Sequence, residues 1–273
     1  MPVRKLAEFV KSWKPFEAAL GQAATNSALN SLDAAEKLLG MPPAQQPNIS
    51  AFSVYADKMK GRKVAVIGRF PDLKPLEEIC HLSVLERRPG EGDLPDAACE
   101  YVLPQQDFVF MTATTLLNKT FPRLLELSKN AFKVMVGPST PMTSLLFELG
   151  IDALAGTVVL DADSVWQAAQ EGAARGIFSH GARMVKVNKE EWQQRRNHQI
   201  GGMWNVPLGT LIGRLRAAAG QEPLACEDET GKAEGERPAW ADPTIVKRTY
   251  DARPTIEAGG HPMPKVMNDL AEL

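Results

Sequence analysis

The 273-residue sequence predicts an α/β fold: a mostly parallel sheet with helices on both of its faces. Short apolar runs alternate with helical patterns between residues 63 and 174, and this alternation is typical of parallel sheets. Two of the apolar runs lead directly into segments crowded with hydroxyls and small residues. In an open α/β fold such segments form a polar rim at the sheet edge where ligands bind, so the rim is our main indication of function.

Residues 1–58 predict a short helical module ahead of the sheet. The first helix is indicated by apolar residues at helical spacing, namely Leu6, Phe9, Val10 and Trp13. After a break at Pro15, a second helix is expected over 16–38, with one face of small residues that would pack closely on a neighbour. A Gly-Met-Pro-Pro segment ends this region at residue 43, and residues 44–50 are expected to form a loop.

Residues 59–187 contain the predicted sheet, with Rossmann-like alternation of strands and helices. Strands are expected at 63–68, 82–86, 101–103, 107–111, 132–136 and 153–159, with an edge strand at 182–187. Helices are expected at 75–80, 120–129, 142–149 and 163–174. Between them, residues 87–97 predict a loop rich in proline, glycine and acidic residues.

Residues 188–273 predict an irregular C-terminal extension that is partly disordered. One amphipathic helix is expected at 207–219, but residues 220–265 carry six prolines, several glycines and an acidic run. No internal repeat is visible in the sequence.

Composition excludes several classes of protein. A net charge of -2 and the lack of a Lys/Arg-dense run argue against a nucleic-acid partner. No stretch approaches the roughly 20 apolar residues that cross a bilayer, so no membrane partner is expected. Three widely spaced cysteines fit a reducing compartment, and we expect a cytoplasmic protein. The four histidines lack metal-ligand spacing, so no residue is predicted to bind a metal directly.

The first strand and the next one end in residues that could bind a ligand. A dinucleotide fingerprint needs three glycines, but only Gly68 is present, with Phe70 and a proline in the turn, which disfavours ordinary NAD(P) binding. Gly68 could equally serve only a tight turn. Glu86 lies 18 residues later, where a carboxylate can bind a ribose diol, or it could pair with a neighbouring arginine at the surface. Asp93 lies in an acidic loop that could contact a ligand or Mg²⁺, or form a solvated turn.

The rim itself consists of two strand-to-helix corners. The segment 112–120 carries four threonines and Asn118, and helix capping by Asn118 or Thr120 explains only one or two of these side chains. The segment 137–141 offers Ser139 or Thr140 as an N-cap, with a proline at the first helical position. These neutral groups suit hydrogen bonds to carboxylate, phosphate or carbonyl oxygens near a helix N-terminus.

Taken together, these motifs resemble the putative heavy-metal chelation family of bacteria and archaea. The matching segments are 12–26, 66–71, 84–86, 92–95, 112–120, 137–141 and 155–159, and the resemblance covers about residues 3–178. It implies a Rossmann-like domain, an N-terminal domain similar to the enolase N-terminal fold, and a site between them. It also implies condensation or hydrolysis steps in making pterin-, flavin- or siderophore-like chelators.

The resemblance implies a set of site residues. Glu17, Glu86 and Asp93 are the acid or base candidates. The expected ligand-binding residues are Asn26, Gly68, Phe70, Thr112, Thr114, Asn118, Ser139 and Thr140. The sequence departs from the family by lacking the strands ahead of the first helix, by Ala113 where the family usually has glycine, and by its tail beyond about residue 188.

Three functions follow as hypotheses. The first is a small-molecule enzyme, of condensation or hydrolysis type, acting on a polar metabolite linked to metal chelation. The second is a non-catalytic protein that binds or delivers a metal–chelate complex. The third is a methyltransferase-like protein that binds S-adenosylmethionine. The expected partner is a small molecule, with a nucleotide-like ligand or a chelated metal as cofactor. A second copy or another chain could complete the N-terminal domain.

Overall fold

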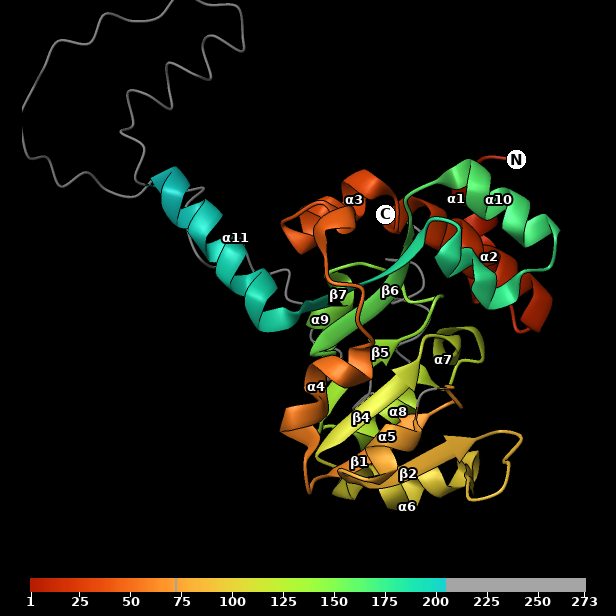
Figure 1. Ribbon diagram of the computed structural model, residues 1–273, viewed down its shortest axis with the longest axis vertical. Coiled ribbons are helices and arrows are strands. Elements are labelled where there is room, and N and C mark those ends of the chain that lie inside the picture. Colours follow the sequence, from red (N-terminus) through yellow and green to blue (C-terminus); the bar gives the residue numbers. More distant parts are fainter. Residues whose placement is uncertain (72, 205–273) are drawn as a thin grey trace, which may run out of the picture. The chain divides into compact units, whose positions relative to one another are not determined.

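A seven-stranded sheet forms the centre of the computed structural model, which describes residues 1–71 and 73–204 (Figure 1). The strand order is β3-β2-β1-β4-β5-β6-β7, and all neighbours are parallel except the antiparallel pair β6 and β7. The strands are β1 (Lys63–Ile67), β2 (His81–Glu86), β3 (Leu94–Pro95), β4 (Phe108–Thr112), β5 (Phe132–Val136), β6 (Ala153–Val159) and β7 (Ala182–Asn188). The predicted α/β fold is therefore confirmed.

Helices cover both faces of this sheet. The α-helices are α1 (Val3–Ala7), α2 (Pro15–Leu29), α3 (Leu32–Leu39), α4 (Ala51–Met59), α5 (Lys74–Glu77), α6 (Cys99–Val102), α7 (Thr114–Leu117), α8 (Phe121–Leu127), α9 (Leu145–Glu148), α10 (Ala162–Gln170) and α11 (Lys189–Trp204). Short 3₁₀ helices are η1 (Glu8–Lys11), η2 (Pro43–Gln45), η3 (Asp96–Ala98), η4 (Leu103–Gln105) and η5 (Ala174–Ser179).

The two faces carry separate hydrophobic cores because side chains alternate along each strand. In β1, Val64 and Val66 pack under α4 and α5, and Figure 1 shows these two helices in front of the sheet. Ala65 and Ile67 point to the other face, where α3 and α6 to α9 contribute buried side chains. Burial on both faces explains why the parallel strands read as continuous apolar runs.

The chain reverses its direction of travel across the sheet between β1 and β4. From β1 it moves outward to β2 and β3, then returns to the other side of β1 as β4, where Ile67 pairs with Met111. In open α/β sheets the crevice beyond the carboxyl ends of two such strands is the usual ligand site. The residues that follow β1, β2 and β4 are therefore the first candidates for a ligand site.

The N-terminal segment contains two helices where the sequence predicted one over 16–38. Helix α2 ends at Leu29 and α3 begins at Leu32, because Ser31 adopts an extended conformation and its hydroxyl accepts a hydrogen bond from Ala34 N at 3.4 Å. On α2 and just before it, two aromatic side chains lie in solvent: Trp13 is 81% exposed and Phe16 is 93% exposed.

Two further predictions were wrong. Residues 101–103 form part of α6 and η4, not a strand, because only Leu103 is buried while Tyr101 faces solvent. Helix α9 begins at Leu145, not at 142, so neither Ser139 nor Thr140 caps a helix. The side chain of Asn30 accepts a hydrogen bond from Met142 N at 2.9 Å, which holds residues 140–143 in a loop outside the helix. The helix predicted at 207–219 lies outside the described residues.

Contacts place residues 1–192 in one compact unit, and a second unit begins at Gln193, within α11. The first turn of α11 belongs to the unit with the sheet: Lys189 Nζ donates to Phe147 O at 3.0 Å, and the rings of Trp192 and Phe147 lie 5.6 Å apart. Among the described helices, none has the length and apolar character needed to cross a membrane.

Candidate ligand-binding site

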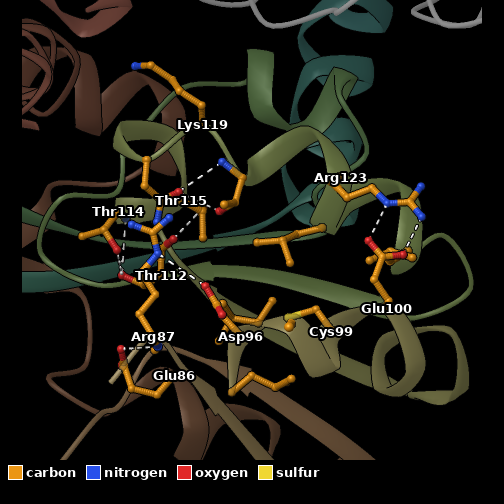
Figure 2. Close-up of a pocket in the computed structure, with 18 residues that line it drawn as sticks. Glu86, Arg87, Asp96, Cys99, Glu100, Thr112, Thr114, Thr115, Lys119 and Arg123 are labelled. Atoms are coloured by element: carbon orange, nitrogen blue, oxygen red, sulfur yellow. Dashed lines mark hydrogen bonds and ion pairs between the residues drawn. The ribbon is translucent and has the colours of Figure 1, made fainter. Parts of the chain in front are cut away.

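A cavity of about 420 Å³ lies at the carboxyl ends of β1, β2 and β4, between α6 and α8 (Figure 2). This volume falls within the range of small-molecule sites. Its lining residues are Ile67, Gly68, Leu85, Glu86, Arg87, Asp96, Ala97, Cys99, Glu100, Thr112, Thr114, Thr115, Asn118, Lys119, Thr120, Arg123, Leu124 and Leu127. Five predicted site residues are therefore brought together: Gly68, Glu86, Thr112, Thr114 and Asn118.

The turn after β1 passes very close to the end of β4. Gly68 has a φ of +94°, and a Cβ built there would lie 3.0 Å from Thr112 Cγ2. Glycine is therefore required for the turn both by its backbone conformation and by the close approach. The ring of Phe70, a predicted ligand-binding residue, packs on Phe52 with centroids 5.5 Å apart and does not line the cavity.

Two neutral donors of the first predicted corner are left for a ligand. Thr112 Oγ1 accepts a hydrogen bond from Thr114 Oγ1 at 3.1 Å, while its own hydroxyl hydrogen has no acceptor within residues 1–71 and 73–204. Asn118 Oδ1 accepts from Thr120 N at 3.1 Å and from Thr120 Oγ1 at 2.6 Å. The amide nitrogen of Asn118 has no acceptor in that same part of the chain. Asn118 thus stabilises its own turn and presents an amide donor at the cavity.

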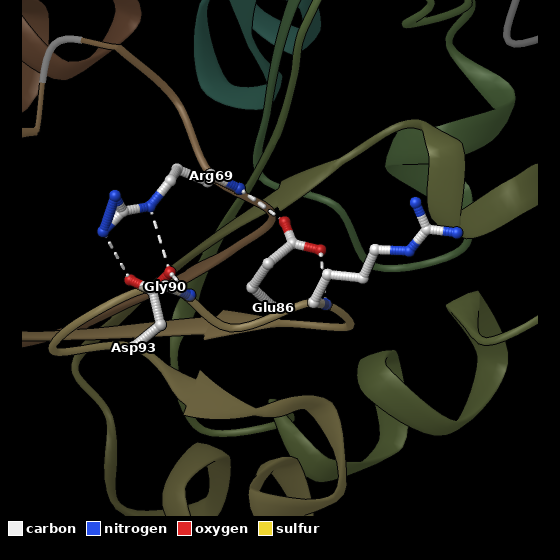
Figure 3. Close-up of polar contacts among 5 residues, drawn as sticks. Arg69, Glu86, Gly90 and Asp93 are labelled. Carbon is white, nitrogen blue, oxygen red and sulfur yellow. Dashed lines mark hydrogen bonds and ion pairs between the residues drawn. The ribbon is translucent and has the colours of Figure 1, made fainter.

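Glu86 is fixed by backbone donors at the end of β2 (Figure 3). Its Oε2 accepts from Arg69 N at 2.9 Å, and its Oε1 accepts from Arg87 N at 2.7 Å. The surface ion pair considered from the sequence does not form, because Glu86 binds the backbone and not the guanidinium of Arg87 or Arg88. A carboxylate has about four acceptor positions, so Glu86 can still accept from a ligand.

Asp93 lies outside the cavity lining and binds a neighbouring arginine instead (Figure 3). Arg69 donates to it through Nε at 3.0 Å and through Nη2 at 2.9 Å, and Gly90 N donates at 2.9 Å. The Asp93 side chain is 1% exposed. This bidentate pair ties the loop after β2 to the turn after β1.

Glu17 also lies outside the cavity lining, in the first turn of α2. Its carboxylate accepts from Ser12 Oγ at 2.6 Å and from Lys14 Nζ at 3.0 Å. The hydrogen bond from Ser12, followed by that from Lys14, lowers the pKa of Glu17 below its ordinary value. The residue therefore holds the chain at the entry to its helix.

Three amide side chains on one face of α2 hold the 137–142 loop. Gln22, Asn26 and Asn30 are four residues apart, which places them in a row along the helix. Asn26 Nδ2 donates to Ser139 O at 2.8 Å, and Gln22 Nε2 donates to the same oxygen at 3.2 Å. Asn30 Nδ2 donates to Thr140 O at 2.9 Å. Asn26, a predicted ligand-binding residue, therefore binds the loop backbone and does not line the cavity.

Sequence reasoning selected Asn26 and missed Gln22 and Asn30, although their spacing of four residues on a helix was visible. Ser139 and Thr140 contribute backbone oxygens to this contact, and neither residue lines the cavity. The hydroxyl of Thr140 is buried and has no hydrogen-bond partner within the described residues.

Apart from Glu86, the charged residues of the cavity were not anticipated. Arg123 Nε donates to Glu100 Oε1 at 2.9 Å, and its Nη1 donates to Glu126 Oε2 at 2.6 Å. Arg87 Nε lies 3.6 Å from Asp96 Oδ2. The lining holds three carboxylates (Glu86, Asp96 and Glu100) and three cations (Arg87, Lys119 and Arg123), so its formal charge is zero. No motif marked Arg87, Asp96, Glu100 or Arg123, since Arg87 and Asp96 lie in the predicted 87–97 loop and Arg123 lies in the predicted 120–129 helix.

Cys99 is the thiol at the cavity wall. Burial, with a smaller contribution from Asp96, raises the pKa of Cys99 to about 11. The thiolate is the nucleophilic form of cysteine, so this group is inert near neutral pH.

Among the described side chains, no three His, Cys, Asp or Glu groups are arranged to hold a metal ion.

Lys119 is the only residue other than glycine, within the described chain, that has a positive φ, at +65°. Its ammonium donates to Val10 O, and burial lowers the pKa of Lys119. Lys119→Gly should be more stable than Lys119→Ala by about 1 kcal/mol, because both lose the ammonium but only alanine has a Cβ in the left-handed region. Urea unfolding of both variants measures the difference. Equal stabilities, or the reverse order, would contradict a left-handed backbone at this position.

Comparison with known proteins identifies the family. Residues 50–188 match the model of the DUF364 family, which is described as "Putative heavy-metal chelation". A curated relative, uncharacterized protein MJ0500 of Methanocaldococcus jannaschii, is 33% identical over 179 residues, or 59% of this chain and 62% of the relative. The chain therefore spans less than two thirds of that relative's length.

Two solved structures of DUF364 proteins with unknown function are similar. The one from Desulfitobacterium hafniense is 40% identical, with a TM-score of 0.64 over 69% of this chain and 76% of that chain. PH1506 from Pyrococcus horikoshii is 20% identical with a TM-score of 0.58 over the same shares of the two chains, and this similarity concerns the fold alone. From the matched family model and these relatives, the chain belongs to the DUF364 family.

Proposed function

We propose that this protein binds a small, polar, oxygen-rich metabolite in the cavity at the ends of β1, β2 and β4, as a carrier. The observation that carries the proposal is the pair of unclaimed neutral donors, Thr112 Oγ1 and the Asn118 amide, in a cavity of about 420 Å³. Their position beside the strand reversal is where open α/β sheets bind ligands. Donors left without protein partners favour a ligand that brings acceptor oxygens.

The state of the acidic and sulfur groups favours binding over turnover. Glu86 is held by three backbone donors, and Asp93 by the guanidinium of Arg69. Cys99 stays protonated near neutral pH because burial raises its pKa. Within the described residues, none of these groups has the arrangement of a nucleophile beside a base.

The family is described as "Putative heavy-metal chelation", so we consider how a heavy metal could bind to this chain. The described side chains offer no group of three His, Cys, Asp or Glu that could coordinate an ion. A metal held by this part of the chain would therefore be bound through an organic chelator, whose oxygens meet the neutral donors of the cavity. Delivery of such a metal–chelate complex fits the description and the geometry together.

A condensation or hydrolysis enzyme is the second candidate, and one observation favours it. Lys119 lines the cavity, and burial lowers its pKa below the ordinary value of a lysine, toward the range of an amine that takes part in proton transfer. Turnover of a chelator precursor by the purified protein, lost in Lys119→Met, would support the enzyme over the carrier.

Native mass spectrometry of gently purified protein tests the binding proposal. Thr112→Val removes the hydroxyl, and Asn118→Asp removes the amide donor while keeping the oxygen that binds Thr120. Each variant should weaken ligand retention about tenfold, the effect of one lost hydrogen bond of about 1.4 kcal/mol. Thr157→Val is the matched control, since Thr157 lies on β6 outside the cavity lining.

The control variant, Thr157→Val, should retain the same amount of ligand as the unaltered protein. Full retention in both cavity variants would contradict the proposal. So would the absence of any retained molecule, if a panel of polar metabolites also failed to raise the melting temperature of the unaltered protein.

A further inference from the structure

We infer that the ligand is a ribonucleoside without a phosphate group, an inference that rests on the proposed function. Three features of the cavity carry it: an acceptor carboxylate at one end, an apolar wall, and cations that are already engaged. Figure 2 shows Glu86 and Thr112 toward one side of the cavity, and Cys99 with the Arg123–Glu100 pair toward the other.

The acceptor is the carboxylate of Glu86. Arg69 N binds its Oε2, while Arg87 N at 2.7 Å and Arg88 N at 3.4 Å both bind its Oε1, which fixes the orientation of the group. Oε2 keeps the capacity for a further hydrogen bond, which a hydroxyl of a ribose diol can donate. A carboxylate at the end of the second strand, beside the crevice, is the position from which α/β folds bind a ribose.

The wall between α6 and α8 is apolar. It is formed by side chains that present carbon or sulfur to the cavity, namely Ile67, Leu85, Ala97, Cys99, Leu124 and Leu127. A flat heterocycle can pack one face against such a surface, and burial of apolar area contributes about 25 cal/mol per Å². The Asn118 amide is then a donor available to ring nitrogens or carbonyls, and the Thr112 hydroxyl lies on the same side of the cavity as Glu86, at the ribose end.

The cations of the cavity are engaged, so a phosphate would find little to bind it. Arg123 binds Glu100 and Glu126, and Arg87 faces Asp96. The ammonium of Lys119 donates to Val10 O, and Figure 2 shows its side chain directed away from the labelled threonines. With one glycine, the turn after β1 has no phosphate cradle, and the Phe70 ring comes within 3.8 Å of a Cβ built on Gly68.

Calorimetry of the full chain with adenosine, 2′,3′-dideoxyadenosine and AMP tests the inference. Loss of the diol should weaken binding by tenfold to about a hundredfold, because it removes a hydrogen bond to a carboxylate. AMP should bind at least tenfold more weakly than adenosine. Glu86→Gln should weaken adenosine to the level of the dideoxy compound.

The decisive comparison uses 2′,3′-dideoxyadenosine. This compound should bind the Glu86→Gln variant with the same affinity as it binds the unaltered protein. Removing both partners of one interaction costs no more than removing either, whereas a disturbed fold would weaken every nucleoside. Glu36→Gln is the matched control, since this exposed carboxylate on α3 does not line the cavity.

Different results would contradict the nucleoside inference and the carrier proposal. Retention of a molecule without a ribose by the unaltered protein, lost in Thr112→Val, would overturn the nucleoside and leave the carrier standing. Equal binding of adenosine and its dideoxy analogue, or tighter binding of AMP, would also overturn the inference alone. If neither nucleosides nor other polar metabolites bind, both proposals fail.

Discussion

Asn30→Asp is expected to lower the free energy of unfolding by about 3 to 5 kcal/mol. The side chain of Asn30 bonds three backbone groups: its Nδ2 donates to Thr140 O at 2.9 Å and Thr157 O at 3.0 Å, and its Oδ1 accepts from Met142 N at 2.9 Å. Aspartate keeps the acceptor but turns a charged oxygen toward two carbonyls in a buried position. Urea unfolding followed by circular dichroism measures the loss.

Asn26→Asp is the matched control on the same helix face. Asn26 donates to one carbonyl, Ser139 O, and is only partly buried, so its replacement should cost about 1 kcal/mol. Similar small losses in both variants would show that Asn30 does not fasten α2 to the loop and to β6.

Gly21→Ala is expected to destabilise the packing of the N-terminal helices by about 3 kcal/mol or more. A Cβ at position 21 would lie 1.9 Å from Val10 N and 2.5 Å from Phe9 C, which are backbone atoms of η1 and cannot rotate away. Helix propensity alone predicts the opposite sign, because alanine is favoured over glycine in a helix interior by about 1 kcal/mol. A loss of stability would show that the close contact between α2 and η1 outweighs helix propensity, and a gain would show the reverse.

Ala23→Gly serves as the control for that experiment, since Ala23 is exposed on the same helix. It should cost about 1 kcal/mol through propensity alone. If Gly21→Ala raised the melting temperature, the close approach of α2 and η1 would be contradicted.

Much of the sheet could be predicted from the sequence, since strands buried on both faces appear as continuous apolar runs. The run at 101–103 had the same appearance, but three residues cannot distinguish a strand from one buried turn of helix. The break at Asn30 and Ser31 was missed because the apolar pattern continues through it. The role of Asn30 in the loop depends on contacts more than 100 positions away in the chain.

The candidate site was predictable where strand ends define it. Gly68, Glu86 and Thr112 end or follow neighbouring strands, so their meeting at one edge follows from a parallel sheet. The other side of the cavity depends on which face α6 and α8 turn inward. Sequence periodicity over four to seven residues is too short to show this, and Cys99 and Arg123 were therefore missed.

The central claim is that a small molecule occupies the cavity beside Thr112 and Asn118. Its most direct test is native mass spectrometry of the unaltered protein beside Ala97→Trp, which places a large side chain at an exposed position of the cavity lining. We expect a retained small molecule in the unaltered protein and its loss in a folded Ala97→Trp variant. Retention of the same molecule at the same occupancy by both proteins would contradict it.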